Sequence, residues 1–351
     1  MQISPRLNAE VWSFPSGKSI YLFQQEFEKI FAKIPKANAI IITDENIFAH
    51  YGHLIKANRK IVIKAGEKYK SLRTILFLSL ELIQMNADRD SHLIGFGGGV
   101  ITDITGFLAS SFMRGIKCSF VPTTLLAMVD AAIGGKNGVN VENNKNLVGS
   151  VRQPDFLFIN TCWLSTLPSE EILSGLAEVA KYGFITEPAI LLLLEHNAHS
   201  ILHNQKVLYD LIRSCVRIKS EIVQRDEMSH GERDMLNFGH TLGHAIELLY
   251  KLPHGIAVSI GMSFALFFSW QKNNISKEEY LSSIALLKKI GLPVKRAFNT
   301  QRVMELLQQD KKKNGNIIKF ILLENIGKAS PYKINTEEIE NSLTRWKSVS
   351  K

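Results

Sequence analysis

The first 165 residues alternate short apolar runs with stretches of helical spacing, and this alternation limits the possible folds more than any other feature of the chain. Helix-like segments separate the runs. Strands that alternate with helices build an open, mostly parallel sheet with helices on its faces. Residues 1–165 are therefore predicted to form an α/β domain of the nucleotide-binding type. The expected strands are residues 39–43, 61–64, 92–97, 118–122 and 156–160.

After about residue 165 the pattern changes to long segments with helical periodicity, which predicts a second, helical domain over residues 166–351. A length of 351 residues suits two domains. Residues 317–323 are expected to form a strand, followed by a last helix with Thr336 as its N-cap. The other predicted helices cover residues 171–182, 187–202, 206–226, 234–250, 255–272 and 277–290.

The charge and the cysteines limit the class of function. The net charge is +9, but the lysines are scattered and no stripe of basic and aromatic residues appears. This favours small anionic ligands over nucleic acid. The three cysteines form no CxxC pair, which suits a reducing cytoplasm. The first 18 residues lack an apolar core, and the longest apolar run, residues 256–270, is too short to cross a membrane and predicts a buried helix.

A glycine-rich turn follows the third predicted strand. In IGFGGGVITDITGFLAS, a strand leads through Gly97, Gly98 and Gly99 into a helix. Glycines let the backbone approach a pyrophosphate, and a helix N-terminus favours its negative charge. A strict GxGxxG pattern needs glycine at position 100, where this chain has valine. An ordinary strand-to-helix turn therefore remains the alternative.

Polar residues follow several of the other strands. In parallel α/β sheets, ligands bind beyond the carboxyl ends of the strands, where an acidic group can bind ribose hydroxyls. A dinucleotide fits this pattern. The groups concerned are Asp44, Glu45 and Asn46 after one strand, Glu67 and Lys70 after the next, and Thr123 and Thr124 after a third.

The stretch NFGHTLGHAIELLYKLPHG, residues 237–255, holds three histidines. His240 and His244 are four apart, so a helix places them on one face, and His254 can fold back towards them. The zinc-protease signature needs Glu directly after the first histidine, and Thr241 stands there. Singly, each histidine is more often structural than a ligand. A catalytic zinc usually needs three protein ligands, so a carboxylate is sought elsewhere.

Several stretches taken together resemble the 3-dehydroquinate synthase family over nearly the whole chain. The resemblance implies a Rossmann-like N-terminal domain, a helical metal-binding C-terminal domain and commonly a homodimer. It rests on GGGVITDITGF, FMRGI, VPTTLLAMVDAAIGGKNGVN, KNLVGS, GLAEVAKYG, RDMLNFGHTLGHAIE, HGIAV and DKK, in this order.

The family is a group of NAD- and metal-dependent carbon–oxygen lyases of the shikimate pathway, which leads to the aromatic amino acids. They convert 3-deoxy-D-arabino-heptulosonate 7-phosphate into 3-dehydroquinate and phosphate. NAD oxidises the substrate transiently, phosphate is eliminated, the hydride is returned and an intramolecular aldol step closes the ring. The resemblance implies zinc as the metal, and cobalt remains an alternative.

The resemblance also assigns residues. It makes Glu178, His240 and His254 the metal ligands, whereas spacing alone suggested His240 with His244, which now belongs to the substrate pocket. Arg114 is expected to reach the partner subunit's active site. The remaining catalytic residues implied are Lys136, Lys181, Lys219, Arg233, Asn237, His244, Asn146, Asp130 and one of Lys311 and Lys312. The NAD-binding residues implied are Asp44, Asn46, Glu67, Lys70, Gly98, Gly99, Val100, Asp103, Thr123, Thr124, Asp130, Lys136 and Lys145, the last of which is alternatively a surface cation.

The chain departs from the family pattern at a few positions. Ile256 follows His254 and Gly255 where the family has Glu, so a carboxylate near the metal site is in doubt. Asn137 and Met128 are smaller departures. Three alternatives remain: a sibling sugar-phosphate cyclase, a metal-dependent alcohol dehydrogenase, and a non-catalytic NAD-binding protein. Lys219, Arg233 and His244 favour a substrate with a carboxylate over those of the siblings.

Overall fold

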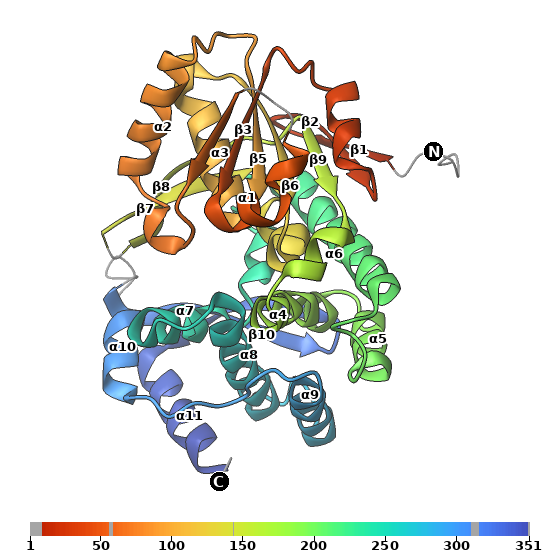
Figure 1. Cartoon of the computed structure of the whole chain (residues 1–351). Coiled ribbons are helices and arrows are strands. Elements are labelled where there is room, and N and C mark those ends of the chain that lie inside the picture. Colours follow the sequence, from red (N-terminus) through yellow and green to blue (C-terminus); the bar gives the residue numbers. More distant parts are fainter. Residues whose placement is uncertain (1–8, 56–58, 143, 310–315, 350–351) are drawn as a thin grey trace. The chain divides into compact units, whose positions relative to one another are not determined.

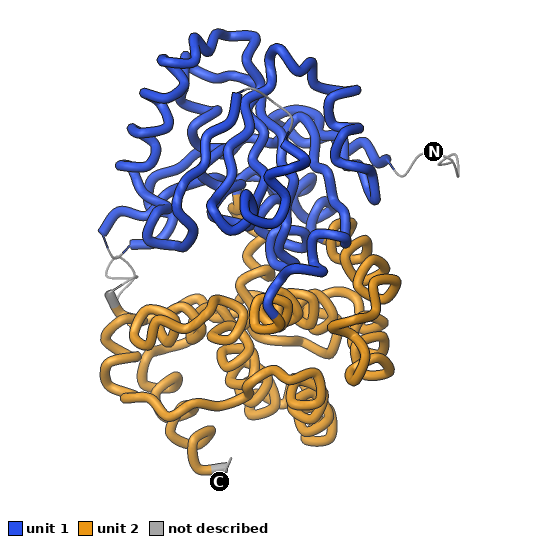
Figure 2. Tube along the Cα trace, viewed as in Figure 1, with its two compact units in different colours: residues 1–168, 219–228 blue, residues 169–218, 229–351 orange. Residues whose placement is uncertain are grey.

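The computed structural model describes residues 9–55, 59–142, 144–309 and 316–349, and the chain divides into two compact units. Met1–Pro168 and Lys219–Met228 form the first unit, and Ser169–Ile218 with Ser229–Lys351 forms the second (Figure 2). Lys311 and Lys312, one of which was expected to contact substrate, lie outside the described residues.

A seven-stranded sheet in the order β1-β2-β9-β6-β5-β3-β4 is the centre of the first unit (Figure 1). All its neighbouring strands are parallel except β1 and β2, which form an antiparallel hairpin at one edge. The strands are β1 (Ala9–Phe14), β2 (Gly17–Phe23), β3 (Ala39–Asp44), β4 (Lys60–Ile63), β5 (His92–Gly97), β6 (Lys117–Pro122) and β9 (Phe156–Ile159).

The middle of this sheet is the core of the first unit because its strands are apolar on both faces. All six residues of β5 are buried, and so are the first five of β3. Helix α3 packs on β5 and β6 and also against a separate antiparallel hairpin. The helices are α1 (Glu45–Tyr51), α2 (Leu72–Gln84) and α3 (Gly99–Ser111), and the hairpin consists of β7 (Lys136–Val141) and β8 (Asn144–Val151).

All five predicted strands are confirmed, each within one residue at either end. Four strands of this unit were not predicted. β1 is half-exposed, and β7 and β8 are largely polar, so these three lack the apolar run of a buried strand. β2 does contain such a run at residues 20–23, with Tyr21, Leu22 and Phe23 buried, and it was overlooked. A π-helical turn at Ala127–Ala131 also escaped notice.

The second unit is built around α8 (His254–Gln271), which is buried around most of its circumference. Helices α4, α7, α9 and α11 and strand β10 pack against it. This confirms the predicted buried helix. Helix α6 (Gln205–Arg225) begins in this unit, and its part from Lys219 onward belongs to the first unit. The remaining elements are α4 (Ser169–Ile185), α5 (Ala189–Asn197), α7 (His240–Tyr250), α9 (Lys277–Lys289), α10 (Thr300–Gln309), β10 (Ile317–Asn325), β11 (Lys328–Asn335) and α11 (Thr336–Val349).

Two details of the second unit correct the sequence analysis. The helix expected over residues 234–250 is broken, because Gly239 has φ of +80° and α7 begins only at His240. The predicted N-cap Thr336 is wrong. Asn335 Oδ1 accepts a hydrogen bond from Glu338 N, and Thr336 is the first residue of the helix.

The described residues contain no helix that is both long and apolar enough to span a membrane. None of Cys118, Cys162 and Cys215 is joined in a disulfide among the described residues.

Candidate functional site

A buried carboxylate and two histidines come together in the second unit. Glu178 lies on α4, His240 opens α7 and His254 opens α8, and these three helices pack side by side (Figure 1). Nε2 of His240 is 3.5 Å from Glu178 Oε1, and Nε2 of His254 is 3.4 Å from the same oxygen. The three ligand atoms lie within 4.8 Å of one another, with Glu178 fully buried.

Glycines let the helices approach closely enough for this. A Cβ on Gly255 would lie 1.9 Å from the main-chain oxygen of Ser174, so only glycine permits α8 to start against α4. Its amide also donates a 3.0 Å hydrogen bond to the Ser174 hydroxyl. A close contact of this kind fixes the position of His254 relative to Glu178, because His254 directly precedes the glycine.

Hydrogen bonds orient both rings. Nδ1 of His240 lies 3.1 Å from the carbonyl oxygen of Phe238, and Nδ1 of His254 lies 3.2 Å from Glu247 Oε2. Both partners are acceptors, so Nδ1 of each ring carries a hydrogen, and Nε2 is the nitrogen that faces Glu178. Glu247 was not singled out in the sequence. Its position in HTLGHAIE, one turn after His244, is the only signal that marks it.

The two histidines differ in their affinity for protons. Burial lowers the pKa of His240 to about 3, and Glu178 offsets this only in part. Burial also acts to lower the pKa of His254, but hydrogen bonds with Glu178 and Glu247 outweigh it and raise that pKa to about 9. Glu247 on the far side of the His254 ring accounts for part of this difference.

A donor set of two imidazole nitrogens and one carboxylate is typical of catalytic zinc. Within the described residues, the side chains present a compact and largely buried set of this kind, so they fit a divalent ion of the zinc or cobalt type. The i, i+4 pair of His240 and His244 alone does not form this set. His244 is exposed, with its ring centroid 5.0 Å from that of His240, and it forms a second cluster with Glu247 and His254.

Other predicted residues surround this cluster or belong to the same unit. Lys181, one helical turn after Glu178, is buried and forms an ion pair with it. Arg233 is buried in the turn of 3₁₀ helix before α7, whereas Asn237 at the end of that turn is exposed. A buried arginine presents a fixed fork of donors that suits a carboxylate or a phosphate.

In the first unit, the glycine-rich turn lies between β5 and α3. Gly98 precedes the helix with an extended backbone, and Gly99 and Val100 form its first turn. A Cβ on Gly98 would be 3.0 Å from Thr124 Cγ2, so this turn packs closely on the residues after β6. A helix N-terminus favours negative charge, so an anion site at the start of α3 stays a prediction.

Lys70 connects several of the expected NAD-binding residues. It is buried, forms an ion pair with Asp103 on α3, and donates a 2.5 Å hydrogen bond to Asn146 Oδ1 on β8. Burial raises the pKa of Asp103, and the Lys70 ammonium opposes that shift. Glu67 accepts a 2.8 Å hydrogen bond from Asn140. Residues from four separate segments thus meet in one polar network.

The other first-unit residues have different surroundings. Asp44 caps α1, because its Oδ1 accepts hydrogen bonds of 3.0 Å each from the amides of Asn46 and Ile47. Part of its capacity to accept hydrogen bonds is therefore used within its own segment. Thr124 Oγ1 accepts from Ala127 N at 3.1 Å. Lys136, Lys145 and Arg114 are exposed. Thr123 is buried, with its hydroxyl in no hydrogen bond among the described residues.

Comparison with known proteins shows the family of the chain. Residues 60–174 match the family model described as 3-dehydroquinate synthase N-terminal, and residues 175–313 match the one described as 3-dehydroquinate synthase C-terminal. The chain belongs to the 3-dehydroquinate synthase family. The 3-dehydroquinate synthase of Clostridium tetani is 38% identical over 315 residues, 86% of this chain and 84% of that protein. That of Dichelobacter nodosus is 41% identical over 301 residues, 82% of each.

Two solved structures share the fold of this chain. A 2-deoxy-scyllo-inosose synthase complexed with carbaglucose-6-phosphate, NAD⁺ and Co²⁺ is 26% identical, with a TM-score of 0.85 over 96% of this chain and 99% of that chain. A 2-epi-5-epi-valiolone synthase from Streptomyces hygroscopicus with NAD⁺ and Zn²⁺ shares the fold at 24% identity and a TM-score of 0.85, over 99% of each chain.

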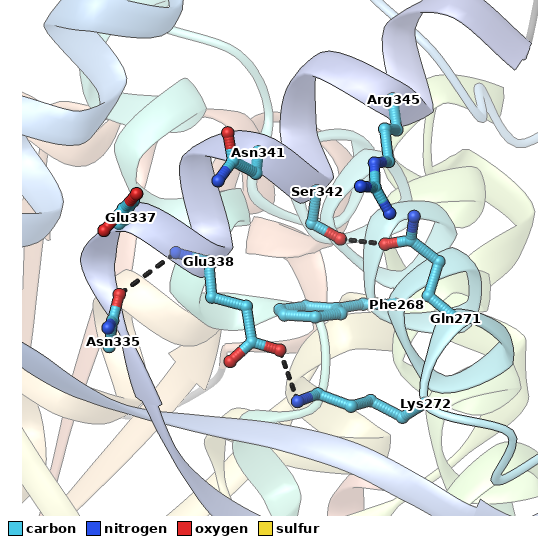
Figure 3. Close-up of a pocket in the computed structure, with 9 residues that line it drawn as sticks. All are labelled: Phe268, Gln271, Lys272, Asn335, Glu337, Glu338, Asn341, Ser342 and Arg345. Carbon is cyan, nitrogen blue, oxygen red and sulfur yellow. Dashed lines mark hydrogen bonds and ion pairs between the residues drawn. The ribbon is translucent and has the colours of Figure 1, made fainter.

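A surface pocket of about 310 Å³ lies elsewhere in the second unit, between the end of α8 and α11 (Figure 3). Its polar side chains largely satisfy one another. Lys272 forms an ion pair with Glu338, and Ser342 donates a hydrogen bond to Gln271. None of the site residues predicted for the 3-dehydroquinate synthase family lines it, and we assign it no role in the reaction.

Proposed function

We propose that this chain is the 3-dehydroquinate synthase of its cell, converting 3-deoxy-D-arabino-heptulosonate 7-phosphate into 3-dehydroquinate and phosphate. The observation that carries the proposal is the buried set of Glu178, His240 and His254 in a chain of this family. Residues 1–165 are proposed as the NAD-binding domain, and residues 166–351 as the domain that binds metal and substrate. The free cysteines favour the cytoplasm as its location.

Two groups of residues are proposed to hold the cofactors. Glu178, His240 and His254 would hold zinc or cobalt, and the glycine-rich turn with the Lys70 network would hold NAD. When bound, NAD exchanges a hydride with a substrate carbon, and a divalent ion polarises the hydroxyls that it contacts. The chain's own residues supply binding and orientation. Asp103 keeps the Lys70 ammonium in place, which prevents a buried positive charge from being left unpaired.

Fixed cations are proposed to bind the anionic substrate. Lys181 and Arg233 of the second unit are both buried, so their charges face less competition from water than surface cations do. Arg233 suits a two-point contact with a carboxylate or phosphate, whereas Lys181 acts as a point charge. His244, exposed beside His240, is placed to exchange hydrogen bonds with substrate hydroxyls, and Asn237 would add a neutral contact.

A homodimer is part of the proposal, with Arg114 contributing to the partner subunit's site. Arg114 is exposed and its backbone has φ of 66°, a conformation that non-glycine residues adopt rarely. Inactive Arg114→Ala and Lys181→Met variants, mixed under conditions that exchange subunits, should regain activity if the role is shared between subunits. No recovery in exchanged dimers would contradict it.

The decisive assay is phosphate release from the heptulosonate phosphate, measured with and without NAD⁺ and before and after treatment with a chelator. The proposal expects release that needs both NAD⁺ and metal and that produces no net NADH. Accumulating NADH would instead indicate a metal-dependent alcohol dehydrogenase. No release from a protein that binds both cofactors would exclude the assignment.

A sibling sugar-phosphate cyclase is the second candidate, because a 2-deoxy-scyllo-inosose synthase shares the fold at 26% identity. The buried Arg233 favours a substrate that carries an additional anionic group. Assays with sugar phosphates that lack a carboxylate separate the two. Turnover of such a sugar phosphate in preference to the heptulosonate phosphate would establish the sibling activity.

A further inference from the structure

The imidazole of His254 is held on two sides. Its Nε2 lies 3.4 Å from Glu178 Oε1, and its Nδ1 lies 3.2 Å from Glu247 Oε2. Glu247 is on α7, one turn after His244, and only 5% of its surface is exposed. A buried carboxylate is costly unless it is compensated by hydrogen bonds or charge. Its contact with His254 supplies such a compensation.

We propose that Glu247 is a positioning residue for the metal site, because it accepts the Nδ1 hydrogen of His254 and keeps Nε2 turned towards Glu178. The inference rests on the proposed function, in which a divalent ion is bound by Glu178, His240 and His254. A carboxylate can only accept at neutral pH, so it selects the ring tautomer whose Nε2 lone pair is available to an ion. It also makes that nitrogen a better donor.

His240 shows why His254 needs this residue. The Nδ1 of His240 lies 3.1 Å from the carbonyl oxygen of Phe238, two residues earlier in the chain. That acceptor is fixed by the local backbone. The corresponding acceptor of His254 is a side chain on another helix, so the orientation of this ring depends on how α7 packs on α8. Removing the Glu247 carboxylate therefore frees the ring of His254 and leaves that of His240 in place.

A competing role for Glu247 is ligation of a second ion, since the ligand atoms of His244, Glu247 and His254 also lie within 4.8 Å of one another. The positioning role is favoured because a second ion on His254 would have to bind Nδ1, and the neutral ring would first have to lose its Nδ1 proton. His244 is, moreover, an exposed side chain on the outer side of this group. The two roles predict different metal stoichiometries.

The test is a Co²⁺ titration of the full chain and of Glu247→Gln and Glu247→Ala variants, followed by the visible absorption of the ion and by competition with a chelator. Loss of an orienting hydrogen bond should weaken Co²⁺ binding about 10- to 100-fold, with one ion per chain before and after. Glu227→Gln is the matched control. It alters a carboxylate that is 4% exposed and bonded to Ser16 and Gln153 in the first unit, so its Co²⁺ affinity should be unchanged.

Proton NMR of the Co²⁺ protein gives a second readout. The exchangeable Nδ1 proton of His254 should exchange with water faster in Glu247→Ala, whereas that of His240 should not change. Thermal unfolding of the metal-free variants shows whether each is folded. If Glu247→Ala is not folded, the test is made with Glu247→Gln.

Three outcomes would overturn the inference. Affinity within twofold of the parent in both variants removes the role of Glu247 and leaves the proposed function intact. Two ions in the parent and one in Glu247→Ala make Glu247 a ligand of a second ion. A parent chain that binds no Co²⁺ removes the metal assignment itself, and this result is distinct from the other two.

Discussion

The Lys219 ammonium lies 2.7 Å from Asp130 Oδ1 and 2.6 Å from the main-chain oxygen of the same residue, although 89 positions separate the two. Lys219 is 5% exposed, so a counter-charge close to its ammonium group is needed. This contact joins α6 to the π-helical turn after β6.

Replacing Asp130 by Asn should lower the free energy of unfolding by about 1–3 kcal/mol, because a buried ammonium loses its counter-charge. Denaturant unfolding at neutral pH measures this. The Lys219→Met variant removes the charge and should be less destabilised than Asp130→Asn. Equal stability of Asp130→Asn and the parent would show that water or other groups replace the ion pair.

Zinc should stabilise the folded chain. An ion that binds only the native state at 100 times its dissociation constant adds about 2.7 kcal/mol to the free energy of unfolding. Calorimetry with zinc and then with a chelator should show this difference. His240→Ala should show none, and a chelator effect of the same size in that variant would place the ion elsewhere.

Gly255→Ala should damage both stability and metal binding. The new methyl group would lie 1.9 Å from the Ser174 oxygen, so α8 must shift, at a cost of about 1–3 kcal/mol. His254 moves with it, and Co²⁺ affinity should fall. Gly52→Ala is the control, because the nearest neighbours of its methyl group are atoms of the Phe48 ring, from 3.1 Å, and that side chain can shift.

The stability of the folded chain should depend on pH through His92. Burial lowers its pKa to about 4, and its Nε2 lies 2.8 Å from Ser119 Oγ. Between about pH 6.5 and pH 4 the unfolded chain binds a proton at this residue that the folded chain does not, so stability falls as the pH falls, by at most about 3 kcal/mol. The His92→Gln variant should lose less stability between pH 7 and pH 4.5 than the parent. The exposed His53→Gln should behave like the parent.

The sequence predicts the interior of this protein better than its edges. The apolar runs of β3 and β5 are buried on both faces, so their position follows from composition alone. The hairpin β7–β8 is polar and partly exposed, and no local pattern separates it from a loop. Helix α10 was not predicted either, although its buried residues Val303, Met304 and Leu307 lie at helical spacing.

The site shows a similar division. Spacing brought His240 and His244 together, but the ligand geometry with Glu178 depends on the packing of three helices. Glu247 lies in a predicted helix, and only its contact with His254 distinguishes it from a surface glutamate. The chain has Ile256 where family resemblance leads one to expect a carboxylate, and the carboxylate found beside His254 is that of Glu247 on α7.

The segment Lys219–Met228 belongs to the first unit although fifty residues of the second unit precede it in the chain. Its Glu227 accepts hydrogen bonds from Ser16 and Gln153, so the sheet unit is completed by a late part of the sequence. The gene therefore cannot be divided at one point into two parts that each encode a complete unit. An exchange of only the first 168 codons between two relatives would combine the sheet of one parent with Lys219 and Glu227 of the other. Such a hybrid should fold well only where the two parents have matching residues at these contacts.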